Sequence, residues 1–166
     1  MVFAPGEGGV KVIISSFGYK YGTPIDADLL LDARTLLNPF TDKSLRNLPG
    51  TSDAVWRFVT ADPRWYKWKA KAEFEAVKLL DIKIKNGARD MIIGIGCHGG
   101  RHRSVVATLE LARFFHWQGG LSLVTKPGTH QVMVGHRDMI KAGKDQKPLR
   151  NLRDIKLAPA KKFAGT

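Results

Sequence analysis

The segment from Asp90 to Phe115 constrains the fold of this chain more than any other stretch. An apolar run that ends near Ile95 is typical of a buried strand, and a helical periodicity of apolar side chains begins at Val105. The loop Gly96–Ser104 lies between them. A strand, a glycine-rich loop and a helix in this order bring free backbone N–H groups and the positive end of a helix dipole to one point. The segment therefore predicts an α/β fold with an anion site at the start of the helix.

The residues of this loop have complementary properties for holding a phosphate group. Gly99 and Gly100 let the backbone approach an anion closely, and Arg103 can offer a bidentate guanidinium. Cys97 ends the strand, where the helix dipole and Arg103 would lower a thiol pKa. The predicted phosphate-binding residues of the loop are Cys97, His98, Gly99, Gly100, Arg101, His102, Arg103 and Ser104.

The spacing of Cys97, Arg103 and Ser104 resembles the C-x-x-G-x-x-R-S/T signature of cysteine-dependent phosphatases. That resemblance implies Cys97 as nucleophile, Arg103 as oxyanion clamp and Ser104 as the group that assists thiolate release. Asp62 is the candidate general acid, although an Asp before Pro is also typical of a helix start. Gly96 departs from the signature, because these enzymes usually have His before the Cys. A buried, unreactive cysteine beside a tight turn is the alternative.

The chain is strongly basic, with 27 Lys and Arg residues against 15 Asp and Glu residues and a net charge of +12. Such a charge favours a polyanionic partner such as RNA. Residues 141–166 hold half of that net charge, two prolines and few large apolar groups, so this tail is expected to be loosely ordered. It would be either a solvated tail or a clamp on phosphate backbones. The candidate nucleic-acid contacts are Lys141, Lys144, Lys147, Arg150, Arg153, Lys156, Lys161 and Lys162.

Length and residue usage favour one α/β domain over residues 1–140, followed by the basic tail at 141–166. No apolar stretch reaches membrane-spanning length, and the first residues lack the pattern of a signal peptide. A single cysteine excludes an internal disulfide and is typical of a reducing cytoplasm. His98 and His102 are four residues apart, but the five histidines lack zinc-type spacing, so neither a metal nor another cofactor is expected.

Hydrophobic patterning and turn residues predict the remaining elements. A short helix is expected over Ala54–Val59, and a long one from Asp62 to about Lys85 with an apolar stripe facing the core. His136 and Arg137 follow the last predicted strand, where they can join the phosphate pocket. The predicted strands besides the central one are Val10–Ser15, Asp28–Arg34, Leu121–Thr125 and Gln131–Val134.

Several stretches together resemble the C-terminal domain of the RapZ family, the bacterial RNase adapter proteins. They occur in family order from about Val12 to Arg137, which makes the combination far more specific than the cysteine loop alone. The matching stretches are Ser16–Gly22 with Pro24 and Asp26–Asp28, Asp32–Arg34 with Asn38 and Pro39, Leu45–Gly50, Ile95–Cys97, Gly99–Gly100, His102–Val105, and His136–Arg137.

This resemblance implies an α/β domain that senses a sugar phosphate, glucosamine-6-phosphate in the best-known members. It also implies binding of small regulatory RNA, a ribonuclease-type protein partner and a homo-oligomer. The implied ligand pocket comprises the Cys97–Ser104 loop with Asp32, Arg34, His136 and Arg137. Without the resemblance, Asp32 and Arg34 would be interpreted as residues of a surface ion pair, which is the commoner case. Within the pocket, Asp32 and His102 would select the hydroxyl or amino groups of the sugar.

Two features separate this chain from RapZ proteins. Phe40 stands where some members have His, and no G-x-x-x-x-G-K-[ST] loop occurs, so nucleotide hydrolysis is not implied. We therefore expect a stand-alone relative without the N-terminal nucleotide-binding domain. The leading hypothesis is a non-enzymatic regulatory or adapter domain that binds a phosphorylated small molecule in the loop. RNA would bind to the basic tail and to the lysine face of the long helix. A cysteine-dependent phosphatase is the first alternative, and a protein whose loop grips a nucleic-acid phosphate is the second.

Overall fold

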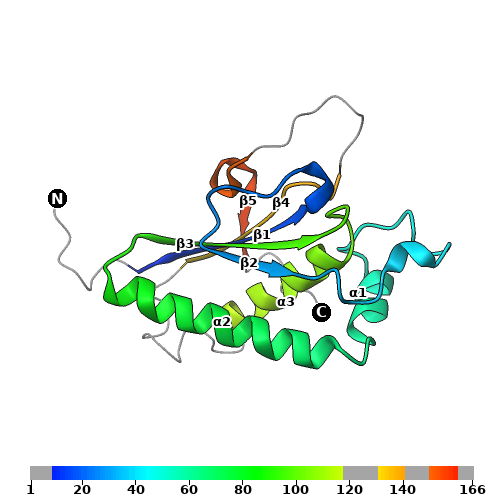
Figure 1. Ribbon diagram of the computed structural model, residues 1–166, viewed down its shortest axis with the longest axis horizontal. Coiled ribbons are helices and arrows are strands. Elements are labelled where there is room, and N and C mark those ends of the chain that lie inside the picture. Colours follow the sequence, from blue (N-terminus) through cyan, green and yellow to red (C-terminus); the bar gives the residue numbers. More distant parts are fainter. Residues whose placement is uncertain (1–8, 118–130, 141–149, 161–166) are drawn as a thin grey trace.

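The computed structural model describes residues 9–117, 131–140 and 150–160 and contains one five-stranded sheet (Figure 1). The strand order is β2-β3-β1-β4-β5. The first four strands are parallel, and β5 pairs antiparallel with β4. This arrangement confirms the predicted single α/β domain with a mostly parallel sheet. The strands are β1 (Lys11–Gly18), β2 (Leu29–Asp32), β3 (Asp90–Cys97), β4 (Gln131–His136) and β5 (Leu157–Pro159).

Three helices pack against one face of this sheet (Figure 1). The long α2 and the central α3 confirm the two long helices expected from periodicity, and α1 confirms the short one. Strand β1 extends beyond its predicted end to Gly18, because its last residues pair with the end of β3. The helices are α1 (Asp53–Thr60), α2 (Trp65–Lys85) and α3 (Arg103–Trp117), with 3-10 turns η1 (Tyr19–Tyr21), η2 (Pro39–Thr41) and η4 (Leu152–Asp154).

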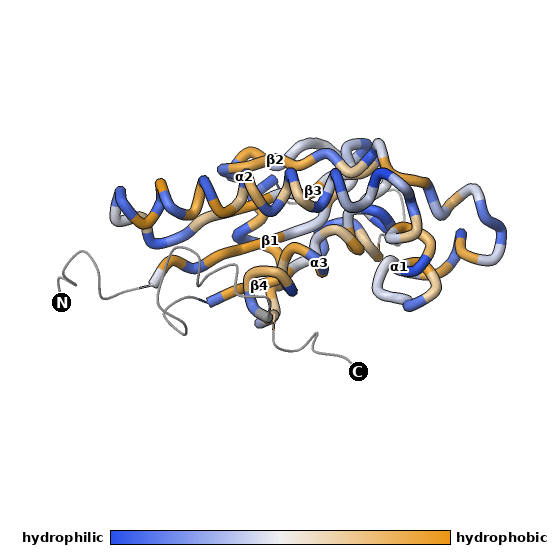
Figure 2. Tube along the Cα trace, turned by 90° about the horizontal axis from the view of Figure 1, so that it is seen from below, coloured by the Kyte–Doolittle hydropathy of each residue, from blue (hydrophilic) through white to orange (hydrophobic). Residues whose placement is uncertain are grey.

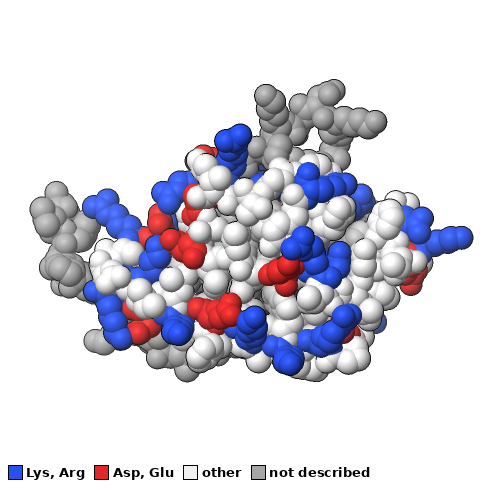
Figure 3. All heavy atoms as spheres, in the orientation of Figure 1, with Lys and Arg blue, Asp and Glu red and all other residues white. Residues whose placement is uncertain are grey.

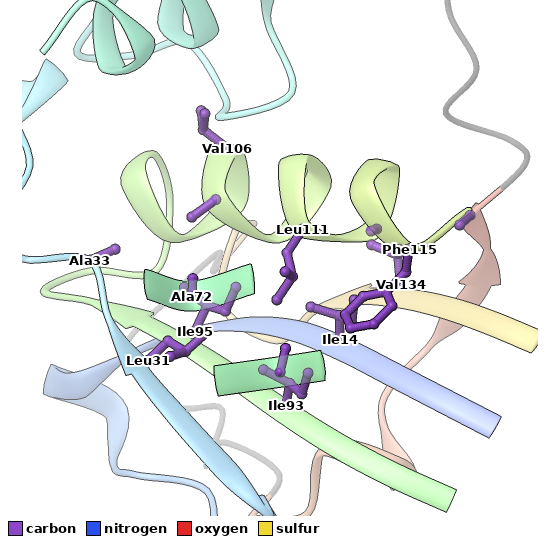
Figure 4. Packing of buried hydrophobic residues seen from close by; sticks show 14 of the residues in the cluster. Ile14, Leu31, Ala33, Ala72, Ile93, Ile95, Val106, Leu111, Phe115 and Val134 are labelled. Atoms are coloured by element: carbon purple, nitrogen blue, oxygen red, sulfur yellow. The ribbon is translucent and has the colours of Figure 1, made fainter. Parts of the chain in front are cut away.

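The main core lies between the sheet and the helices (Figure 4). Alternate residues of a strand point to opposite faces, so Ile14 of β1 and Ile93 of β3 face the helices. There they meet Leu111 and Phe115 of α3 and Ala72 of α2. Figure 2 shows the same pattern, because the strands are largely apolar and helix α2 alternates between apolar and polar residues. The predicted core-facing stripe of α2 is thus confirmed.

Residues 150–160 correct the expectation of a loosely ordered tail. They form β5, the edge strand beside β4, and η4, whose Leu152 is fully buried against Ile13 and Ile92 on the second face of the sheet. The carboxylate of Asp26 accepts the backbone N–H of Leu152 at 2.7 Å and of Arg153 at 3.1 Å. A parallel sheet needs cover on both faces, and the few apolar side chains of this segment supply part of it.

Other sequence expectations fall outside the described residues. These are the strand Leu121–Thr125 and the tail positions 141–149 and 161–166. The division of the chain at residue 140 stays a prediction.

Close backbone contact fixes the loop after β3 against the end of β1. A Cβ built on Gly18 would lie 2.5 Å from the carbonyl carbon of Gly99. A Cβ built on Gly100 would lie 2.5 Å from the nitrogen of Gly18, and Gly100 has a φ of 72°. In contrast, a Cβ on Gly99 would meet only Cε of Lys20, at 4.0 Å. Two of these three glycines are therefore required by packing.

We predict that Gly100→Ala destabilises the fold far more than Gly99→Ala. The first change combines a positive φ with a clash against backbone, so we expect the free energy of unfolding to fall by about 2–4 kcal/mol. The second adds a methyl group where there is room, so we expect less than about 1 kcal/mol. Urea unfolding of both variants measures the difference, and equal losses would contradict the packing argument.

Candidate functional site

The loop between β3 and α3 presents unpaired backbone donors to the carboxyl edge of the sheet. None of the backbone N–H groups of residues 98–102 donates a hydrogen bond to another described residue. Two loop carbonyls are turned away to neighbours: His98 accepts from the N–H of Lys20 at 3.1 Å, and Arg101 accepts from the N–H of Gly50 at 2.9 Å. Helix α3 begins directly after the loop. The loop thus offers donors and a helix N-terminus, the two features that bind anions.

Two loop side chains attach the loop to the segment before α1. Arg101 Nη2 donates to the carbonyl of Asn47 at 2.6 Å, and Nε2 of His102 contacts the carbonyl of Leu48 at 2.7 Å. A carbonyl only accepts, so Nε2 carries the proton. Burial lowers the pKa of His102 below its usual value, which keeps the ring neutral. His102 therefore supports the loop, whereas His98 and Arg101 are exposed at its rim.

Cys97 and Arg103 are both buried at the base of the loop. The sulfur of Cys97 lies 3.1 Å from the hydroxyl of Ser104. Nη1 of Arg103 donates to the carbonyls of Arg34 at 2.8 Å and Leu36 at 3.2 Å. The arginine predicted as a phosphate clamp thus has one nitrogen bound to the segment after β2. It ties that segment to the start of α3.

Asp32 and Arg34 form a bidentate ion pair beside the loop. Arg34 Nη2 lies 2.7 Å from Asp32 Oδ2, and this hydrogen bonding lowers the pKa of the Asp32 carboxyl. The backbone carbonyl of Asp32 accepts from the indole N–H of Trp68 at 2.8 Å. The ring of Tyr19 lies under the Arg34 guanidinium, with 4.0 Å from the guanidinium carbon to the ring centre.

His136 and Arg137 reach the same edge but make mainly internal contacts. Arg137 pairs with Asp138 at 2.8 Å and donates to the carbonyl of Gly22 at 2.6 Å, with only 3% of its side chain exposed. Nδ1 of His136 lies 2.8 Å from the hydroxyl of Ser16. Burial lowers the pKa of His136 to about 4, so the ring is neutral near pH 7. The geometry makes Arg137 a clamp that holds the turn after β1.

Sequence reasoning missed Lys20, which stands at the rim of the loop. Besides the hydrogen bond from its N–H to His98, its side chain passes nearest the Cβ position of Gly99. Its side chain is exposed and its amine lies 4.9 Å from the centre of the Tyr21 ring. The available signal was its place two residues after Gly18, the glycine that ends β1.

Asp62 has a structural role in the fold. Its carboxylate accepts the backbone N–H groups of Leu37 at 2.6 Å and Arg64 at 2.9 Å, as well as the Arg64 guanidinium at 2.9 Å and 3.0 Å. These bonds, chiefly those from the Arg64 side chain, lower the pKa of Asp62 to about 2. A carboxyl that is ionised near neutral pH has no proton to give, so this geometry does not support Asp62 as a general acid.

The described residues show no cluster suited to a metal ion and no membrane-spanning helix. No group of three or more His, Cys, Asp or Glu side chains comes together within them. None of their helices is both long and apolar enough to cross a bilayer. Of the predicted nucleic-acid contacts, Arg150, Arg153 and Lys156 are described and exposed. Arg153 lies 3.6 Å from Asp26 and 3.5 Å from Asp90, whose charges partly offset its own.

Comparison with known proteins identifies relatives over most of the chain. A family model described as the RapZ C-terminal domain matches residues 10–140. A nucleotide-binding protein of Heliobacterium modesticaldum is 40% identical over 132 residues, which is 80% of this chain and 40% of the relative. One from Geobacter metallireducens is 38% identical over 139 residues, which is 82% of this chain and 45% of the relative. The chain thus spans less than half the length of these relatives.

We predict that Asp62 stabilises the fold in a pH-dependent way. Its pKa of about 2 lies below the ordinary value of 3.8, so the contribution is complete above about pH 4 and is lost as the pH falls toward 2. Asp62→Asn should lower the free energy of unfolding at pH 7 by about 2 kcal/mol and flatten its acid dependence. Urea unfolding at several pH values measures both effects. As a control, Asp53→Asn removes a fully exposed ion pair and should change little; equal effects would contradict the role of Asp62.

Proposed function

The chain belongs to the RapZ C-terminal domain family, and on this premise we propose that it is a regulatory or adapter domain that binds a phosphorylated small molecule. The binding site is the loop between β3 and α3. One observation carries the proposal: the N–H groups of residues 98–102 have no partner among the described residues and lie at the start of α3. We call the N–H groups of residues 98–102 the cradle. Backbone donors at a helix start can bind phosphate oxygens, so the site needs no buried cationic side chain.

The ligand that the family implies is a sugar phosphate of the glucosamine-6-phosphate type. The exposed side chains of Lys20, His98 and Arg101 surround the cradle, and the first and last of these add positive charge for a dianionic phosphate. Asp32, ionised through its bond to Arg34, is placed at the same edge to accept from a hydroxyl or an ammonium group. His102 and Arg137 would act indirectly, by holding the loop and the turn after β1.

RNA binding forms the second part of the proposal. Figure 3 shows Lys and Arg side chains spread over one face of the molecule with Asp and Glu between them. Helix α2 contributes exposed Lys67, Lys71 and Lys78. Such surfaces bind phosphate backbones without reading sequence. A ribonuclease-type protein partner, a homo-oligomer and a cytoplasmic location come from the family resemblance and belong to the same proposal.

A cysteine-dependent phosphatase is the second candidate function. The 3.1 Å contact between Cys97 and Ser104 favours it, because a serine hydroxyl beside the sulfur can donate to a thiolate. Against it stand the burial of Cys97 and the engagement of Asp62 elsewhere. Binding without turnover is therefore the function that this geometry supports better.

We predict that glucosamine-6-phosphate binds reversibly and that Lys20 contributes to its affinity. In a phosphorus NMR titration, the sugar-phosphate line should shift or broaden and remain intact. Lys20→Met should weaken binding roughly fivefold through loss of a charge-assisted contact. Lys78→Met makes the same change of charge on α2 and should leave the affinity unchanged.

The same spectra separate binding from catalysis. Growth of an inorganic phosphate line that Cys97→Ser abolishes would establish the phosphatase instead. If the spectrum does not change at millimolar ligand, glucosamine-6-phosphate is not the ligand of this loop.

We predict that RNA affinity depends steeply on salt, since each phosphate contact releases counterions. With only about three such contacts, raising the salt from about 50 mM to about 200 mM should weaken binding roughly tenfold or more. Filter binding with a fixed RNA hairpin measures this dependence. An affinity that stays constant over that range would exclude binding through basic surfaces.

A further inference from the structure

Arg34 forms a flat and rigid surface at the edge of the phosphate loop. Its guanidinium lies over the ring of Tyr19, with the guanidinium carbon 4.0 Å from the ring centre. Its Nε donates to Asp32 at 3.0 Å and 3.1 Å, and its Nη2 donates to Asp32 at 2.7 Å. A guanidinium held both from below and along one edge cannot rotate freely. Arg34 is therefore fixed in plane before any ligand arrives.

The support under Arg34 is built into the strand ends. Tyr19 packs edge-to-face on Phe17, with ring centres 4.8 Å apart. Gly96 leaves room for both rings, since a Cβ there would lie 2.5 Å from Tyr19 and 2.6 Å from Phe17. On the other side, Trp68 holds the backbone carbonyl of Asp32. The platform thus rests on β1, β2 and β3 at once.

The ion pair with Asp32 makes Arg34 a poor phosphate ligand. The carboxylate offsets its charge and occupies two of its three nitrogens. Yet 49% of the Arg34 side chain remains exposed. The contacts with Tyr19 and Asp32 therefore leave much of this side chain open to a ligand. A guanidinium face stacks on planar π systems, including nucleobases.

Two hydrogen bonds connect the segment of Arg34 with the loop between β3 and α3. Arg103, the first residue of α3, donates to the carbonyl of Arg34 at 2.8 Å. The N–H of Ala33 donates to the carbonyl of Gly96 at 2.8 Å, one residue before Cys97. These hydrogen bonds place the segment that carries Arg34 beside the loop that precedes α3.

We propose that the Arg34–Tyr19 platform is a subsite for a purine base and that the site accepts a purine nucleoside monophosphate. The inference rests on the proposed phosphate site, because the loop would hold the phosphate while the base stacks on Arg34. A saturated sugar ring has no π face and gains little from a guanidinium surface. A purine gains both the stacking contact and the charge–π attraction.

The test compares adenosine 5′-monophosphate with ribose 5-phosphate by calorimetric titration of the full chain. The two ligands share the phosphate and the sugar and differ in the base. We expect the nucleotide to bind roughly tenfold more tightly. Arg34→Lys keeps the charge but removes the plane, and Tyr19→Leu removes the support. Each should remove the tenfold advantage, so that the nucleotide loses much more affinity than ribose 5-phosphate does.

Arg57→Lys is the matched control, because Arg57 is also an exposed arginine paired with an aspartate, Asp53, at 2.8 Å. It should keep the full advantage of the nucleotide. Equal affinities of the parent protein for the two ligands would overturn the subsite and leave the phosphate site intact. An Arg34→Lys variant that weakens both ligands equally would also overturn it. If neither of these ligands nor glucosamine-6-phosphate binds, the proposed function itself fails.

Discussion

The carboxyl edge of the sheet depends on the backbone contact between the end of β1 and the loop after β3. Gly18 and Gly100 approach so closely that neither position has room for a Cβ. Asp138 strengthens the contact, since its carboxylate accepts the N–H of Gly18 at 2.8 Å and pairs with Arg137. These contacts fix the position of the loop relative to the end of β1. The N–H groups of residues 98–102, which have no partner among the described residues, lie in this fixed segment.

Gly96 connects the chemistry of the loop with the architecture around it. At this position the phosphatase signature has a histidine, but a side chain here would collide with the rings of Tyr19 and Phe17. The rings of Phe17 and Tyr19 fill this space, and Arg34 lies over the ring of Tyr19. The departure from the signature is thus a packing requirement. In place of a histidine beside the Cys97 sulfur, the chain has two aromatic rings that support Arg34.

The sequence predicted what depends on local periodicity and missed what depends on tertiary contacts. The strand, loop and helix around Cys97 were predictable, because apolar spacing and glycines determine them locally. The segment at 150–160 was not, since its few apolar residues carry no periodic signal among basic ones. Its place after a predicted strand and the family resemblance predicted Arg137 as a ligand-binding residue, but they gave no sign of its internal contacts. Asp138, which pairs with Arg137, is its neighbour in the sequence. The carbonyls of Gly18 and Gly22, which accept from Arg137, are distant in the sequence and come close only in the folded chain.

The cationic side chains at the carboxyl edge of the sheet form two groups, one buried and one exposed, with different roles. Arg103 and Arg137 are withdrawn from solvent, and carbonyls or a carboxylate compensate their charge. Lys20 and Arg101 remain at the surface. At the proposed site, the attraction for an anion would therefore come chiefly from fixed N–H dipoles, which need no reorganisation when a ligand binds, and the rim cations would add to it. Because backbone dipoles do not depend on side-chain identity, specificity at the proposed site would come from the groups beside the loop, among them Arg34, which Asp32 and Tyr19 hold in place.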